Sequence, residues 1–305
     1  MTEIDAVRLN FSPESLVALD VILAFVLFGV ALDIRLADFK GIVTAPRGTV
    51  IGILAHSVLL PAVAWVLTMV LEPDPSIALG MILVASCPSG NISNFLVNHA
   101  RGNTALSVTI AAFSMLGSIF FTPFNLAFWG DLNPHTRPIL QSVALSPWEV
   151  LGTVVVLLGI PTAAGIWVSH RFPAFATRAR QPFRLLSLAF FVLFVVGALV
   201  VNWEFFLRYT QRVVLFVFLL NAFALLTGYY TARAARLPEA DRRAVSLEVG
   251  IQNSGFGLAL VFNFFGGLGG MAIVAAWWGI WHLLAGLTVS TWWRRHPPVA
   301  SGATT

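Results

Sequence analysis

Long apolar segments follow one another along this chain of 305 residues, and short polar breaks separate them. A helix needs roughly 20 residues to cross the apolar layer of a bilayer, which is about 30 Å thick. Segments of that length predict nine membrane-spanning helices, at residues 16–36, 49–71, 76–99, 103–129, 147–169, 183–203, 211–233, 239–265 and 270–293. The breaks hold turn-forming residues such as Pro46, Pro73 and Pro134. The pattern predicts an all-α polytopic membrane protein with a single transmembrane domain over residues 16–293.

The composition narrows the class of protein further. Hydrophobic residues make up 58% of the chain and charged residues only 10%, whereas a soluble domain has roughly 25% charged residues. This excludes a soluble enzyme and a nucleic-acid-binding protein. The single cysteine, Cys87, has no partner in the chain for a disulfide. We expect membrane lipid and a small solute as partners, no nucleic acid, and a monomeric chain.

The basic residues indicate the orientation in the membrane. If the N-terminus lies outside, 14 of the 18 Lys and Arg residues fall on the inside, as the positive-inside rule requires. We therefore expect residues 1–15 outside the cytoplasm and residues 294–305 as a cytoplasmic tail, in an inner or plasma membrane. Residues 1–15 lack the basic run of a secretory signal, so the first apolar segment is expected to remain as a span.

Two of the predicted spans are interrupted by polar residues and glycines. Residues 86–94 surround Pro88 and Gly90, and residues 248–257 hold three glycines beside Glu248. Irregular backbone at membrane depth is tolerated only inside the protein or around a cavity, and paired interruptions indicate a secondary transporter. A deep carboxylate indicates a functional site, although Glu248 could instead be a structural carboxylate satisfied by its neighbours. The available ligand atoms are oxygens, which suit Na⁺ better than a transition metal.

Both interruptions carry a family resemblance. Residues 87–94 with 100–103, and residues 243–253, resemble two signature motifs of the bile acid:sodium symporter family, and the resemblance extends from about residue 17 to residue 293. It implies an inverted-repeat transporter fold in which two discontinuous helices cross and a core moves against a panel. The first helix of the ten-helix family fold is expected to be missing. The implied core covers about 49–129 and 211–293, and the implied panel about 16–36, 147–169 and 183–203.

The resemblance also implies ligands for one or two sodium ions. One site would use Ser93, Asn94, Ser107 and Glu248. The other would use Glu248, Gln252 and backbone carbonyls near Val249 and Ile251. Two positions depart from the family pattern, because Ala111 replaces a Thr and His56 replaces a Gln. His56 is then either a neutral, hydrogen-bonded imidazole or a protonation site that replaces part of the cation requirement.

The substrate contacts implied by the resemblance lie at the same crossing. The implied residues are Asn91, Asn253, Ser254, Gly255 and His282. Each has a structural alternative, since Asn91 and Ser254 could cap half-helices and His282 could be a core histidine. No organic cofactor is expected.

The function predicted is sodium-coupled symport of an organic anion by alternating access. The anion would be bile-acid-like, pantoate-like or another monocarboxylate. The open alternatives are a proton-coupled or uncoupled organic-anion carrier and an extruder of metalloid oxyanions with a related fold. A channel is a further alternative, whereas an enzyme is disfavoured because the predicted site holds a single deep carboxylate.

Overall fold

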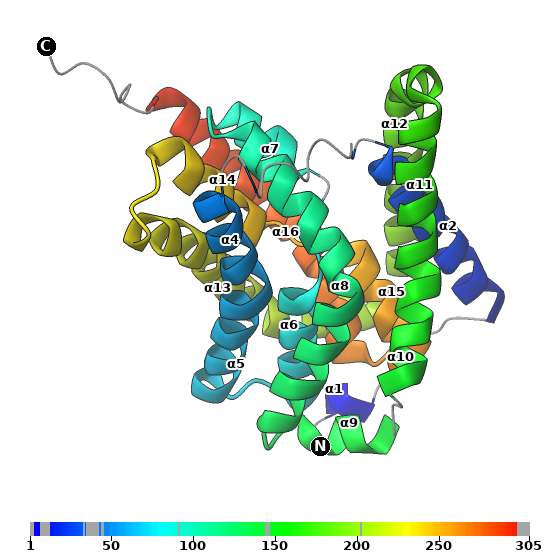
Figure 1. Ribbon diagram of the computed structural model, residues 1–305. Coiled ribbons are helices and arrows are strands. Elements are labelled where there is room, and N and C mark those ends of the chain that lie inside the picture. The colour runs from blue at the N-terminus through cyan, green and yellow to red at the C-terminus, as the bar shows by residue number, and fades with distance from the viewer. Residues whose placement is uncertain are drawn as a thin grey trace, which may run out of the picture.

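The computed structural model describes residues 3–6, 13–32, 34, 43, 46–90, 92–143, 147–201 and 203–297. Every regular element within these residues is a helix, and η2 and η3 are π-helical (Figure 1). The elements are α1 (Glu3–Ala6), α2 (Pro13–Ala31), α4 (Pro46–Leu54), η2 (Ala55–Leu59), α5 (Leu60–Leu71), α6 (Pro75–Ser86), α7 (Ser93–His99), α8 (Thr104–Leu132), α9 (Arg137–Val143), α10 (Pro147–Val154), η3 (Val155–Gly159), α11 (Ile160–Arg171), α12 (Pro173–Val201), α13 (Trp203–Ala234), α14 (Glu239–Gly250), α15 (Ser254–Phe265) and α16 (Gly269–Arg295).

Five of the described helical segments are long and apolar enough to cross a membrane. They are Pro46–Leu71, Thr104–Leu132, Leu151–Arg171, Leu207–Ala234 and Gly269–Arg295. Large apolar side chains lie exposed along them, as at Val66, Phe120 and Leu226, and such residues suit contact with lipid. An all-helical fold with these segments is that of a polytopic membrane protein.

Several helices extend beyond the apolar segments that predicted them. α12 begins at Pro173 and α13 at Trp203, both earlier than the predicted spans. The added turns carry basic residues such as Arg178 and Arg208. A polar residue ends an apolar segment but does not end a helix, because its side chain leaves the backbone hydrogen bonds intact. The span predicted to begin at residue 211 therefore lies within a longer helix that begins at Trp203.

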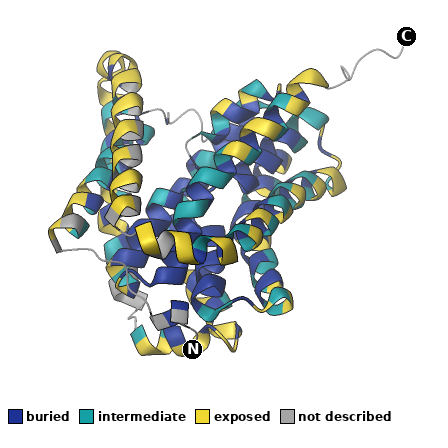
Figure 2. Cartoon of the chain, turned by 180° about the vertical axis from the view of Figure 1, so that it is seen from behind, coloured by how far each residue is buried: buried dark blue, intermediate teal, exposed yellow. Residues whose placement is uncertain are grey.

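The helices form two groups. α2, α11 and α12 pack against one another and stand on one side of the molecule (Figure 1), with a small apolar cluster of their own that includes Leu32, Ala176 and Ala179. The other group contains α4 to α8 and α13 to α16, where the buried residues concentrate, while the α12 side is largely exposed (Figure 2). A polar contact joins the groups, because the Asn263 amide on α15 donates to Asp20 on α2 at 2.8 Å.

The segment before α5 is π-helical because a proline follows it. Pro61 has no N–H to donate to the carbonyl of Ser57, and a single π-turn absorbs the mismatch. The side-chain amide of Asn125 on α8 donates to the freed Ser57 carbonyl at 2.9 Å. The π-turn thus holds His56 in a buried position, with 3% of its surface exposed.

α13 and α14 approach each other closely at Gly228. A Cβ at this position would lie 2.7 Å from the Cα of Ser246 and 2.7 Å from the carbonyl oxygen of Val245. Both are backbone atoms, so no rotamer change relieves the contact. Gly228 therefore sets the distance at which α14, which carries Glu248, packs on its neighbour.

We expect Gly228→Ala to lower the free energy of unfolding by about 1–3 kcal/mol, the usual cost of overpacking. Thermal unfolding of the purified protein in detergent measures the change. Gly197→Ala on α12 is the matched control, since a Cβ there meets nothing within 4 Å and alanine favours a helix. Equal stability of the two variants would contradict the proposed close approach.

Candidate functional site

The two interruptions meet in the middle of the larger helix group. The amide of Gly90 donates to the carbonyl of Ile251 at 2.8 Å, and the amide of Asn253 donates to the carbonyl of Pro88 at 2.8 Å. Ser89 and Gln252 pair as an antiparallel bridge between these bonds. The two broken helices therefore cross as a short two-stranded contact, which confirms their predicted interruptions and meeting point.

Small residues allow this contact. A Cβ on Gly90 would lie 3.0 Å from the Cγ2 of Ile251 and 3.1 Å from the carbonyl oxygen of Gln252. Pro88 ends α6 because it offers no amide hydrogen to the preceding turn. The chain therefore passes from helix to extended backbone at the point where the second segment crosses it.

Side chains from other helices satisfy the backbone groups that the breaks release. The hydroxyl of Thr122 on α8 donates to the Ser86 carbonyl at the end of α6, at 2.6 Å. The amide of Asn221 on α13 donates to the Gly250 carbonyl at the end of α14, at 2.7 Å. Asn253 caps α15 by accepting from the Phe256 amide at 3.1 Å. Free backbone groups at membrane depth require such partners.

Glu248 lies fully buried beside the crossing, at the end of α14. The hydroxyl of Ser107 donates to its Oε1 at 2.5 Å, and the hydroxyl of Ser89 donates to its Oε2. The Ser107 hydroxyl also lies 2.7 Å from the Oδ1 of Asn94, and the Ser89 hydroxyl lies 3.4 Å from that of Ser93. The structure thus brings together the four residues predicted for the first sodium site: Ser93, Asn94, Ser107 and Glu248.

This group has more oxygen acceptors than donors. A carboxylate offers about four lone-pair directions, and each serine hydroxyl carries one hydrogen. The Ser107 hydrogen cannot serve both Glu248 and Asn94. Among the described residues no Lys, Arg or His forms an ion pair with Glu248. A cation bound among these oxygens would supply the missing positive charge, and oxygen ligands suit Na⁺.

The residues predicted for the second sodium site form a separate group. The Gln252 amide nitrogen donates to the Val249 carbonyl at 2.7 Å, and its Oε1 lies 3.1 Å from the Nε2 of His56. The Ile251 carbonyl accepts from Gly90. Both oxygens of Glu248 bond to Ser89 and Ser107 instead. Gln252 and His56 are therefore in contact. The Val249 and Ile251 carbonyls each accept from an N–H donor, whereas the Glu248 oxygens accept from hydroxyls.

The residues predicted for the substrate are only partly assembled by the described structure. Asn253, Ser254 and Gly255 lie together at the start of α15, whereas Asn91 lies outside the described residues. His282 lies buried on α16. Within the described part of the chain, its Nδ1 has no hydrogen-bond partner.

The position of His282 along α16 follows from its neighbours on the same helix face. Ala275 lies 3.9 Å from the Cβ position of Gly257, and a Cβ on Gly286 would lie 2.9 Å from the Cδ1 of Ile251. Residues 275, 282 and 286 follow helical spacing, so His282 faces the same side between those contacts. The Nε1 of Trp278, one turn earlier, is also buried and has no hydrogen-bond partner among the described residues.

Other residues at the crossing also escaped prediction. Ser89 bonds to Glu248, and its amide donates to the Ser114 hydroxyl at 3.2 Å. Thr122, Asn125 and Asn221 stabilise released carbonyls. Their signal in the sequence is a polar side chain within an apolar segment, which requires a partner at that depth.

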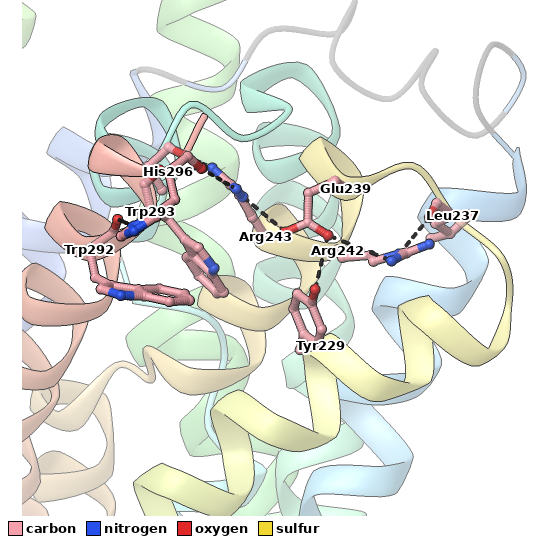
Figure 3. A network of polar contacts seen from close by, with 9 residues as sticks. Tyr229, Leu237, Glu239, Arg242, Arg243, Trp292, Trp293 and His296 are labelled. Carbon is pink, nitrogen blue, oxygen red and sulfur yellow. Dashed lines mark hydrogen bonds and ion pairs between the residues drawn. The ribbon is translucent and has the colours of Figure 1, made fainter. Parts of the chain in front are cut away.

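A second polar network lies at the far ends of α14 and α16. The guanidinium of Arg243 donates to the carbonyls of Trp293 and His296, at 3.0 and 2.7 Å (Figure 3). It also donates to the carbonyl of Ala100 at 2.9 Å. Its Nε donates to Glu239 at 3.1 Å. Arg243 therefore joins the ends of α7 and α16 to the start of α14.

Known proteins resemble this chain over most of its length. Residues 20–208 match the model of the Sodium Bile acid symporter family. The "Uncharacterized sodium-dependent transporter YocS" of Bacillus subtilis (strain 168) is 30% identical over 90% of this chain and 82% of its own length. The "Probable sodium/metabolite cotransporter BASS1, chloroplastic" of Arabidopsis thaliana is 28% identical over 90% of this chain and 66% of its own length. The "Ileal sodium/bile acid cotransporter" of Homo sapiens is 25% identical over 77% of this chain and 66% of its own length.

Proposed function

Because this chain belongs to the sodium bile acid symporter family, a family of sodium-dependent transporters rather than enzymes, we propose that it carries an organic anion across the membrane together with sodium. The observation that carries the proposal is Glu248, a fully buried carboxylate at the crossing with hydroxyl and amide oxygens around it. A buried charge of this kind requires compensation, and a sodium ion provides it.

The coupled cation would bind among Glu248, Ser107, Asn94 and Ser93. The hydroxyl hydrogens that now point at Glu248 would turn away from the ion, leaving their oxygens as ligands. A second ion, where one binds, would use Glu248, Gln252 and the backbone carbonyls near Val249 and Ile251, with His56 in the place of a family Gln. Sodium is cargo in this scheme.

The organic anion would bind at the crossing next to the cation. The start of α15 presents the positive end of the helix dipole, which favours a carboxylate. Asn253, Ser254 and Gly255 lie there, and Asn91 and His282 complete the proposed set. The names of the relatives refer to metabolites and bile acids, so a bile-acid-like or smaller monocarboxylate is the proposed substrate class.

Alternating access would arise from movement between the two helix groups. In this proposal α2, α10, α11 and α12 form the panel, and the remaining spans form the core. The chain would have nine spans, because the inverted repeat lacks its first helix. The contact of Asp20 with Asn263 would break and reform as the groups move. The N-terminus would face outside and the C-terminus the cytoplasm, in a bacterial inner membrane. Cation binding would order the crossing before the anion binds, which couples the two affinities.

Uptake by purified protein in liposomes tests the proposal. We expect an inward sodium gradient to accelerate uptake of at least one labelled carboxylate among bile acids, pantoate and pyruvate, compared with an equal potassium gradient. Acceleration by a proton gradient alone would instead indicate a proton-coupled carrier. Uptake that responds to neither gradient would contradict coupled symport.

A further inference from the structure

The oxygens around Gln252 differ from those around Glu248 in one respect. At Glu248 the donors are hydroxyls, which rotate and can expose a lone pair to a cation. Around Gln252 the donors are N–H groups, which hold their hydrogens in fixed directions. The Val249 carbonyl accepts from the Gln252 amide, and the Ile251 carbonyl accepts from Gly90.

The contacts of Gln252 show which atom donates the hydrogen in its bond with His56. The Gln252 amide nitrogen must face the Val249 carbonyl, 2.7 Å away, because two oxygens at that distance would repel. Its Oε1 therefore faces the Nε2 of His56 at 3.1 Å, and an oxygen acceptor there requires a hydrogen on Nε2. The Nε2–H tautomer of the neutral ring provides that hydrogen.

We propose that the N–H of His56 occupies the position of a second sodium ion at Gln252, so that the chain binds a single sodium ion per transport cycle. The inference rests on the proposed function and deepens it. His56 is held in place by the π-turn and by the bond from Asn125 to the Ser57 carbonyl. The imidazole therefore occupies the Gln252 oxygen, whereas the hydroxyls at Glu248 can rotate and leave its oxygens to an ion.

The charge at the crossing agrees with one ion. Glu248 is the single carboxylate that the described structure places there, and one sodium ion neutralises it. Before the organic anion binds, a second ion would leave an uncompensated positive charge in a buried, membrane-embedded site, which is costly. A neutral N–H donor satisfies the Gln252 oxygen without that charge.

Binding of radioactive sodium to the purified full-length protein tests the inference without knowledge of the substrate. We expect saturation at one ion per chain. His56→Gln replaces the N–H donor by a side chain that can turn an oxygen toward the same place, so we expect bound sodium to double at saturation. His170→Gln is the matched control, because His170 is exposed on α11, and it should bind one ion.

The outcomes separate this inference from the proposed function. Two ions bound by the unmodified chain, or one ion still bound by His56→Gln, would overturn the role of His56 and leave sodium coupling intact. No sodium bound by the unmodified chain would overturn the proposed function itself. If His56→Gln does not fold, the unmodified chain still decides between one ion and two. At saturating sodium, its free energy of unfolding should rise linearly with the natural logarithm of the sodium concentration, with a slope of RT for each ion bound.

Discussion

Glu248→Gln should weaken sodium-stimulated uptake by about 100-fold or more. The substitution keeps the volume of the side chain and one oxygen, but it removes the negative charge. Loss of one partner of a buried ion pair costs about 3–5 kcal/mol, and each 1.4 kcal/mol is about tenfold in affinity. The same preparation of liposomes used for the uptake assay measures the loss, and radioactive sodium binding should fall in parallel.

Glu204→Gln is the control for this result. Glu204 lies exposed at the start of α13, away from the crossing, and its loss of charge should leave uptake unchanged. Sodium-stimulated uptake by Glu248→Gln at the rate of the unmodified chain would show that the carboxylate is not a cation ligand. In that case the hydroxyls of Ser89 and Ser107 would serve a structural carboxylate only.

The interruptions and their meeting could be predicted because their causes are local. Pro88 removes a backbone donor, and glycines and polar residues weaken the helix on both sides of Gln252. Helices that are broken at membrane depth require partners for their backbone, and two such breaks can satisfy each other. The acidic residue in the second break, Glu248, predicts a functional site beside these breaks.

The contacts that set the properties of the site could not be predicted in the same way. His56 and Gln252 are 196 residues apart in the chain, and their bond depends on a π-turn that Pro61 and Asn125 create together. Ser89 is part of the first motif, yet its bond to Glu248 depends on the extended backbone after Pro88. Such contacts follow from the packing of several helices, and periodicity along one helix does not contain that information.

The ends of α7, α14 and α16 that lie far from the crossing depend on Arg243, the first residue of the second motif. Arg243 is 3% exposed and donates to three backbone carbonyls and to Glu239. Its guanidinium also lies 5.7 Å from the ring of Trp293. A planar group with five donors fits this arrangement, and a lysine, which has one nitrogen, does not.

Arg243→Met should lower the free energy of unfolding by about 3 kcal/mol, because it leaves buried carbonyls without donors and Glu239 without its closer partner. Arg243→Lys should recover only part of the loss. Thermal unfolding in detergent, followed by tryptophan fluorescence, would report the change close to Trp293.

Arg242→Met is a demanding control because Arg242 is the adjacent residue and also contacts Glu239, at 3.6 Å. Its side chain is 27% exposed and donates to one backbone carbonyl, that of Leu237, at 2.7 Å (Figure 3). Its loss should cost about 1 kcal/mol or less. If both substitutions lower the free energy of unfolding equally, the positive charge near Glu239 stabilises these helix ends. The hydrogen bonds that join α7, α14 and α16 would then contribute little. A loss confined to Arg243 would mean that the position of α14, and with it Glu248, depends on an anchor far from the crossing.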